Sequence, residues 1–316
     1  MSPFRLPTVT AIVYDYHDKE KNSELIYDPV SDGRFGSIWD RRLFQPGRQN
    51  AVRPNFTSAT PDWGLAYVAS LPYNGWSTGG KAMKIVSLNI RHGGGNKTAK
   101  IAAWLRAQSA DLILLTEWRS NDSGTSLKEA IESAGYISFG ETRSTAADGI
   151  LVAVKYPFST SRLTPPSSPK GEIVAAELAG LKILCGYFPQ GDAKKPFFDI
   201  FLEQAASVQT PLLLIGDLNT RRNDIDLEAG AAKFSCANQF IELTDKAEMI
   251  DLWRQSNGAD AREWTWRSSK NGFRIDHAFG NKALLASASA IKCSYDPSTR
   301  DGGLTDHSGV IVDIAY

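Results

Sequence analysis

From Met83 to the C-terminus, short apolar runs alternate with stretches whose apolar residues recur at helical spacing. Such runs are typical of strands buried on both faces. They predict strands at 84–90, 111–117, 149–156, 172–178, 181–188, 211–218, 273–280, 288–295 and 308–315, and helices at 97–108, 126–135 and 197–208. Asn96 is the expected N-cap of the first helix, and Gly135 is expected to close the second. Two successive sets of strands and helices predict an α/β fold in which two sheets pack face to face with helices outside.

The first part of the chain has a different character. Residues 2–82 are rich in Pro, Gly, Asn, Asp and Arg, and their apolar residues show no period. We therefore divide the chain into an N-terminal extension of unassigned fold, 1–82, and a folded domain, 83–316. Two interpretations of the extension stay open. It is either a loosely ordered segment or the product of an overextended reading frame, with Met83 as the natural start.

The composition argues against several classes of protein. Cys185, Cys236 and Cys293 are an odd number of cysteines without zinc-type or CxxC spacing, so neither a disulfide framework nor a cysteine metal site is indicated. The N-terminus lacks a signal-peptide pattern and no apolar run could span a bilayer, so we expect a cytoplasmic protein without a membrane partner. The formal net charge of 0 weakens the case for a nucleic-acid substrate without excluding it.

Polar residues stand at the ends of several apolar runs: Asn89, Glu117, Asp217, Asn219 and Asp276. Taken singly, each is best explained as a turn residue or a cap. Because strand ends in a layered sheet protein converge on one rim, the set predicts a single polar site built from distant parts of the sequence.

Six segments, SLNI, LLTEW, GYFPQG, LIGDLN, RIDH and TDHSG, occur in the order found in the endonuclease/exonuclease/phosphatase superfamily. From Met83 to Tyr316 the chain resembles that superfamily, and most of all the exonuclease III type of apurinic/apyrimidinic endonuclease, through GYFPQGD and through GDLN followed by DLW and RID. The resemblance implies a four-layer α/β/β/α sandwich of two mixed sheets. It also implies a magnesium-dependent phosphodiester hydrolase whose catalytic domain is 83–316.

The resemblance gives three residues to the metal. Glu117 is similar to the main magnesium ligand of the family, Asp306 to the second carboxylate, and Asn89 to the asparagine beside the metal that can also hold a phosphate oxygen. Carboxylate oxygens suit Mg²⁺, a hard cation that keeps several waters, and Mn²⁺ is the expected substitute.

The resemblance also assigns the proton-transfer groups. Asp217 matches the aspartate that orients the attacking water, and we favour it as the base. His307 matches the histidine that faces the phosphate, and Asp276 matches the carboxylate that holds its ring in one tautomer. This Asp–His pair is the rival candidate for the base.

Three further residues are expected around the substrate. Asn219 and Gln190 match neutral donors to phosphate oxygens. Tyr187 matches a tyrosine near the metal and the leaving group, although a core aromatic is the alternative at the end of an apolar strand.

The sequence departs from the family pattern at Arg91, where relatives often carry a small polar or acidic residue. A guanidinium cannot ligate magnesium, so Arg91 is expected to pair with substrate phosphate. Arg221 and Arg222 either contact phosphate or lie in a solvated loop.

Other conspicuous residues receive no catalytic role. His277 is expected to point away from Asp276, on the opposite face of the strand, as a satisfied or solvent-facing histidine. The glycines 93–95 are expected to form a flexible turn. For Trp264, Trp266 and Phe273 a packing cluster is favoured over a base-stacking platform.

Three functions remain open on the sequence alone. The leading hypothesis is a DNA nuclease, either an abasic-site endonuclease or a 3′–5′ exonuclease, that acts as a monomer. Near neutrality favours a second, a phosphodiesterase or phosphatase acting on a small molecule or a lipid headgroup. The third is a catalytically inactive binding module, against which the intact Glu117, Asp217, Asn219 and His307 argue.

Overall fold

A computed structural model describes residues 9–14, 22–27, 38–40, 82–165, 168 and 170–316. The chain divides into two compact units, Met1–Asn74 and Gly75–Tyr316. In the first unit, β1 (Val9–Tyr14), β2 (Asn22–Tyr27) and β3 (Ile38–Asp40) form a three-stranded antiparallel sheet, in a segment where the sequence predicts no element. The rest of the extension lies outside the described residues, and the boundary at Met83 stays a prediction.

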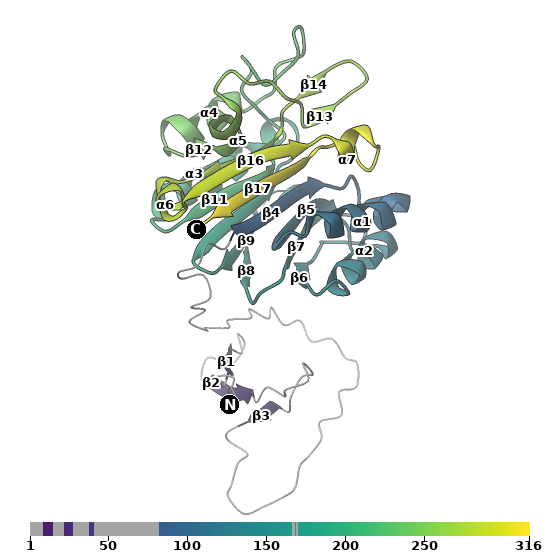
Figure 1. Ribbon diagram of the computed structural model, residues 1–316, viewed down its shortest axis with the longest axis vertical. Coiled ribbons are helices and arrows are strands. Elements are labelled where there is room, and N and C mark those ends of the chain that lie inside the picture. Colours follow the sequence, from purple (N-terminus) through teal and green to yellow (C-terminus); the bar gives the residue numbers. More distant parts are fainter. Residues whose placement is uncertain (1–8, 15–21, 28–37, 41–81, 166–167, 169) are drawn as a thin grey trace, which may run out of the picture. The chain divides into compact units, whose positions relative to one another are not determined.

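The second unit contains two six-stranded sheets (Figure 1). The first has the order β16-β17-β4-β5-β7-β6, with β4 at Ala82–Asn89, β5 at Leu112–Trp118, β6 at Ile137–Gly140, β7 at Gly149–Val154, β16 at Ala290–Asp296 and β17 at Gly309–Ala315. The second has the order β12-β15-β11-β10-β9-β8, with β8 at Ser159–Arg162, β9 at Glu172–Leu178, β10 at Leu181–Tyr187, β11 at Leu212–Asp217, β12 at Ile250–Asp251 and β15 at Asp276–Gly280. Both sheets mix parallel and antiparallel pairs.

Alternate residues of the inner strands enter different layers of the core. Ile85 of β4 joins the layer between the two sheets, whereas Val86 faces α1 (Thr98–Gln108) and α2 (Asp122–Glu132) on the outer side. In the second sheet, Ile183 of β10 enters the layer between the sheets, and Leu184 packs against α3 (Lys195–Ser207) and α4 (Ala237–Asp245). The predicted four-layer α/β/β/α sandwich is confirmed.

Smaller elements complete the domain. They are α5 (Leu252–Asn257), α6 (Lys282–Ser287), α7 (Ser298–Asp301), the 3₁₀ turns Gly95–Lys97 and Gly191–Lys194, and a two-stranded ribbon of β13 (Trp266–Arg267) and β14 (Gly272–Phe273). Within the described part of the chain, no helix has both the length and the apolar character needed to cross a membrane.

The predicted helix ends need correction. The first helix does not use Asn96 as its N-cap, because a 3₁₀ turn occupies Gly95–Lys97 and Lys97 takes the cap position without a side-chain hydrogen bond. The second helix begins at Asp122, and Asn121 caps it by accepting from the backbone N–H of Gly124 at 3.0 Å. Both errors reflect local turn geometry that overrides the apolar spacing.

Candidate active site

The ends of four inner strands meet at one cleft. β4 runs parallel to β5 and β10 runs parallel to β11, so the last residues of each pair lie at the same edge. β15 begins at Asp276, directly opposite Asp217 at the end of β11. A cleft of about 1170 Å³ opens here. The expected site residues that line it are Arg91, Glu117, Tyr187, Gln190, Asp217, Asn219, Asp306 and His307.

Asn89 links the two sheets behind this cleft. The side chain is on β4 of the first sheet and is 1% exposed. Its Nδ2 donates to Glu117 Oε1 at 3.0 Å and to Asp217 Oδ2, on the second sheet, at 2.9 Å. Its Oδ1 accepts from the backbone N–H of Arg91 at 2.9 Å. One amide therefore fixes the separation of two carboxylates that come from different sheets.

Glu117 departs from the regular ladder of its strand. The register between β5 and β7 shifts between Thr116 and Trp118, and Glu117 has φ 55°. A non-glycine residue keeps such a conformation only where its surroundings hold it. Besides its bond from Asn89, the carboxylate accepts the backbone N–H of His92 on Oε2 at 3.0 Å. The irregularity aims a strand residue into the cleft.

Asp217, Asp276 and His307 form the buried cluster, in which no residue is more than 5% exposed. Asp276 Oδ2 lies 2.8 Å from His307 Nδ1. Burial alone would lower the pKa of His307, but the carboxylates of Asp276, Asp217 and Asp306 outweigh it and raise the pKa to about 10. Burial, followed by the charge of Asp276, raises the pKa of Asp217 to about 7. The cluster thus holds a protonated imidazole beside a carboxyl group that titrates near neutrality.

The turn after β11 holds Asp217 in place. Its Oδ1 accepts the backbone N–H of Asn219 at 2.9 Å, and Asn219 has φ 49°. Asn219 Nδ2 donates to the Phe188 carbonyl at 2.8 Å, so this amide supports the turn; its contact with phosphate stays a prediction. Lys194, a residue that the sequence did not single out, donates from Nζ to the Asn219 carbonyl, and burial lowers its pKa to about 8.

Tyr187 packs in the core, as one of its two predicted descriptions has it, and also lines the cleft, while its place near a metal and a leaving group stays a prediction. Its ring packs against the core between the sheets, and the residue lines the cleft close to Glu117. Burial and the nearby carboxylates of Glu117, Asp148 and Asp217 raise the pKa of the phenol, which keeps it a donor. Gln190 is exposed at the start of the 3₁₀ turn after β10 and lines the same cleft.

Asp306 and Arg91 are neighbours. Arg91 Nε lies 3.8 Å from Asp306 Oδ2, and the indole N–H of Trp266 donates to the same oxygen at 3.1 Å. Burial would raise the pKa of Asp306, but His307 and the bond from Trp266 lower it below its usual value. The side chain of Arg91 is 64% exposed, so it is free to meet an anion from solvent.

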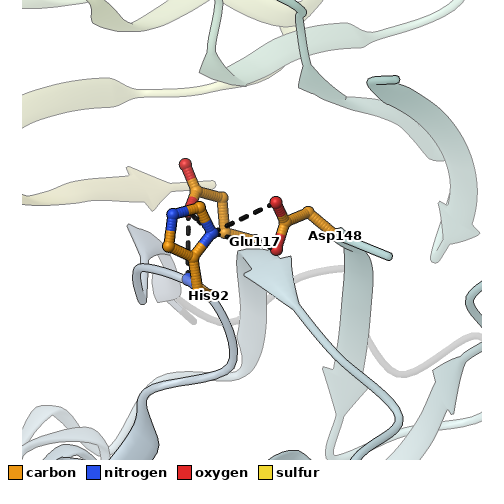
Figure 2. A group of neighbouring side chains, drawn as sticks. All are labelled: His92, Glu117 and Asp148. Carbon is orange, nitrogen blue, oxygen red and sulfur yellow. Dashed lines mark hydrogen bonds and ion pairs between the residues drawn. The ribbon is translucent and has the colours of Figure 1, made fainter. Parts of the chain in front are cut away.

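A second group of two carboxylates and a histidine consists of His92, Glu117 and Asp148 (Figure 2), and we call it the open cluster. His92 Nδ1 lies 3.1 Å from Glu117 Oε2 and 3.2 Å from Asp148 Oδ2. Arg119 Nε donates to Asp148 Oδ1 at 2.6 Å. Sequence reasoning missed His92, Asp148 and Arg119. Asp148 and Arg119 flank predicted strands, as the selected residues do, and that position was their available signal.

Of the loop arginines, Arg221 is neither a phosphate contact nor solvated. It is 0% exposed, its guanidinium carbon lies 3.5 Å from the Phe234 ring centroid and 4.2 Å from that of Phe273, and Nη2 donates to the Ala232 carbonyl at 2.5 Å. Arg222 instead pairs with Asp224 at 2.6 Å. The two alternatives weighed for the pair were wrong for Arg221, because its partners are aromatic rings distant in sequence.

The aromatic residues before β15 form the expected packing cluster. Trp266 stacks on Phe273 with ring centroids 5.7 Å apart, and both residues also line the cleft. The ring of Trp264 covers Gly272 of β14.

His277 points away from the buried cluster, as its place on β15 predicts. It is 0% exposed, its Nε2 lies 2.9 Å from the Thr220 carbonyl, and its ring packs between Phe240 and Phe279. Its Nδ1 is also buried and has no hydrogen-bond partner within the described part of the chain. Burial, helped by the charge of Arg274, lowers the pKa of His277 to about 4, so the ring is neutral at pH 7.

Solved structures of similar fold include DNA-processing enzymes. A single-residue variant of the 3′ phosphatase NExo from Neisseria, bound to product DNA hairpin, is 20% identical with a TM-score of 0.63, over 74% of this chain and 100% of that one. The 3′–5′ exonuclease NExo from Neisseria meningitidis is 21% identical with a TM-score of 0.61, over the same shares. An AP endonuclease from Archaeoglobus fulgidus is 16% identical with a TM-score of 0.60, over 73% and 98%. At these identities the matches show the fold.

The sequence itself matches a family model over residues 86–307, which is more than half of the chain. The matched range contains every predicted site residue, from Asn89 to His307. This chain belongs to the Endonuclease/Exonuclease/phosphatase family.

Proposed function

We propose that this protein is a divalent-metal-dependent phosphodiester hydrolase that acts on DNA, at abasic sites or at 3′ ends. One observation carries the proposal. The Asn89 amide holds Glu117 and Asp217 in a single cleft, and the buried Asp276–His307 pair lies beside Asp217. A phosphoryl-transfer site needs this combination of a cation ligand, a proton acceptor and a positive group.

The donor atoms at the cleft suit a hard cation such as Mg²⁺. Glu117 would supply a carboxylate oxygen and Asp306 a second one directly or through water, and Asn89, whose amide nitrogen faces Glu117 while its oxygen accepts from Arg91, would hold the Glu117 carboxylate in position. A bound magnesium ion would polarise the phosphoryl group and offset its charge.

The chain's own groups would perform the proton chemistry. Asp217, with its pKa near 7, would orient water and accept its proton. His307 would present a protonated ring to the phosphate oxygens, with Asp276 fixing that ring. Tyr187 would donate a hydrogen bond near the leaving oxygen, and Gln190 and Asn219 would contact the other phosphate oxygens.

The choice of DNA rests on the charges of the cleft and on its relatives. The chain as a whole is neutral, but the cleft is lined by five basic side chains, Arg91, Arg119, Arg143, Lys170 and Lys233, in addition to the buried Lys194. Basic groups around an acidic centre suit a polyanion whose phosphates extend beyond the cleaved bond. The Neisseria enzyme of similar fold is bound to a DNA hairpin.

A substrate panel tests this proposal. Purified protein with magnesium should be assayed against abasic duplex DNA, a hairpin with a 3′-phosphate, single-stranded DNA, RNA and bis(p-nitrophenyl) phosphate. The proposal is supported if the wild-type protein cleaves a DNA substrate and His307→Ala, purified in the same way, does not. The variant serves as the control for contaminating nucleases. Cleavage of the small ester alone would instead indicate a small-molecule phosphodiesterase, and no cleavage of any substrate would indicate a binding module.

A further inference from the structure

The contacts around His92 Nδ1 conflict with one another. Within 3.3 Å of this nitrogen lie Glu117 Oε2 at 3.1 Å, both carboxylate oxygens of Asp148 at 3.2 and 3.3 Å, and Nη2 of Arg119 at 2.8 Å. If Nδ1 carries a proton, it faces the N–H of Arg119, donor against donor. If it carries none, its lone pair faces two carboxylates. No protonation state satisfies all four contacts.

A divalent cation would remove the conflict. The lone pair of Nδ1 and the oxygens of Glu117 and Asp148 lie within 4.8 Å of one another, so all three could point at one ion. Figure 2 shows the imidazole of His92 next to both carboxylates, with dashed contacts from His92 to Glu117 and to Asp148. Arg119, whose side chain is 24% exposed, supplies the positive charge at this place without an ion.

The two oxygens of Glu117 face different partners. Oε1 is turned to Asn89 and Oε2 to His92. We propose that His92, Glu117 and Asp148 form a second divalent-cation site, which shares Glu117 with the site of the proposed function and takes ions that accept a nitrogen ligand.

The ligand set distinguishes this site from a magnesium site. An imidazole nitrogen suits Mn²⁺ or Zn²⁺ better than Mg²⁺, which prefers oxygen donors and octahedral hydration. For an ion to bind, the Arg119 guanidinium must move away from the ligand atoms, toward the solvent side of the cleft.

Titration of the metal-free full-length protein with Mn²⁺, without any substrate, tests the proposal. Free Mn²⁺ is counted by electron paramagnetic resonance, and a directly bound nitrogen is detected by its ¹⁴N modulation in the spin-echo spectrum. Wild type should bind two ions per chain with ¹⁴N modulation. His92→Ala and Asp148→Asn should each bind one, and His92→Ala should lose the modulation. Asp313→Asn, a carboxylate on β17 that does not line the cleft, is the control and should match wild type.

Arg119→Gln separates a metal site from an ordinary ion-pair network. Removing the competing cation should tighten Mn²⁺ binding by about two- to fivefold, the range that corresponds to one partly exposed ion pair. If His92, Glu117 and Asp148 are instead an ion-pair network that Arg119 holds in place, Arg119→Gln should weaken Mn²⁺ binding. That result would overturn the proposal. The proposal would also be overturned if wild type and His92→Ala bound the same number of Mn²⁺ ions per chain. It would likewise be overturned if the ¹⁴N modulation persisted in His92→Ala, because His307 would then be the nitrogen ligand. Binding is measured without turnover, so an inactive protein that shows the expected pattern refutes only the proposed function.

Discussion

The cleft contains two groups of the same composition, each with two carboxylates and one histidine, and they differ in burial. In the buried cluster, Asp276 and His307 have side chains 4% and 6% exposed. In the open cluster the side chain of His92 is 56% exposed. Two like charges in a dry site need a positive charge held permanently between them, whereas a solvated site can exchange its cation.

The difference teaches how one family fold can separate two tasks. The buried cluster holds its positive charge as a proton on His307, fixed by Asp276 at 2.8 Å. The open cluster holds its charge on Arg119, a side chain that can be replaced by an ion from solution. Under the two proposals made above, acid–base chemistry would belong to the first group and cation exchange to the second. Of the four predictions below, the first two test this division.

The largest loss of activity is expected from Glu117→Gln, because Glu117 belongs to both proposed cation sites and is held by Asn89. Activity should be abolished at limiting magnesium and recover in part at high magnesium or with manganese, since a charged ligand becomes neutral. Stability should barely change. Turnover as a function of metal concentration measures this, with Glu177→Gln on the exposed side of β9 as control. Wild-type metal dependence in Glu117→Gln would place the ion elsewhere.

The buried cluster should respond through turnover and not through substrate affinity. His307→Ala should lower kcat by at least about two orders of magnitude, the scale of a lost proton-transfer or charge partner, with little change in substrate affinity. Asp276→Asn should resemble it. Because the pair acts as one unit, the double variant should lose little more than the worse single variant. Losses that add in full would show that the two side chains act independently.

His277 should affect stability and not catalysis. Its pKa is about 4 in the folded protein against 6.5 for a free histidine, so the unfolded chain binds the proton first as the pH falls through this window, and folding loses up to about 3 kcal/mol. His277→Phe should be about 1 kcal/mol less stable than wild type at pH 7, from the lost bond to Thr220, and more stable near pH 4.5.

The difference between the two proteins is the quantity to measure, by urea unfolding at several pH values. Asp217 titrates in the opposite sense over the whole of this window: its folded pKa of about 7 exceeds the ordinary 3.8, so its contribution is full below 3.8 and is lost as the pH rises through 7. That contribution is common to both proteins. A constant gap across the range would contradict the assignment of a neutral buried His277.

The smallest effect is expected from shortening the chain to begin at Met83. Both clusters lie after this residue, and only the pairing of Ala82 with Ala315 is removed from the first sheet. Turnover and Tm should equal those of the full chain. A chain that begins at Gly75, the start of the second compact unit, is the matched comparison. Loss of solubility or activity in both would make the extension part of the working enzyme.

Apolar runs predicted the inner strands well because burial on both faces leaves a continuous signal. β9 has its expected bounds, and the inner strands β4, β5, β10 and β11 begin and end within two residues of expectation. The small elements were missed, since a two-residue strand such as β13 or β14 has no period to detect.

The open cluster was missed for a different reason. His92 follows Arg91 in a turn where both have positive φ, and its approach to Glu117 depends on the irregularity in β5. Sequence spacing carries no information on either feature. Arg221 was misjudged because a charged residue in a polar loop suggests solvent, whereas Phe234 and Phe273 enclose it only in the folded chain.

The bond from Asn89 to Asp217 crosses from one sheet to the other, so the spacing of Glu117 and Asp217 depends on how the two sheets pack on each other. The layer between them contains Ile85, Leu114, Ile183 and Leu213. A change of volume in that layer, far from any phosphate, would be transmitted to the spacing of Glu117 and Asp217, and displacements of about 1 Å can cost about 100-fold in rate. Interior packing thus becomes a route by which evolution can tune turnover while every residue of the cleft stays the same.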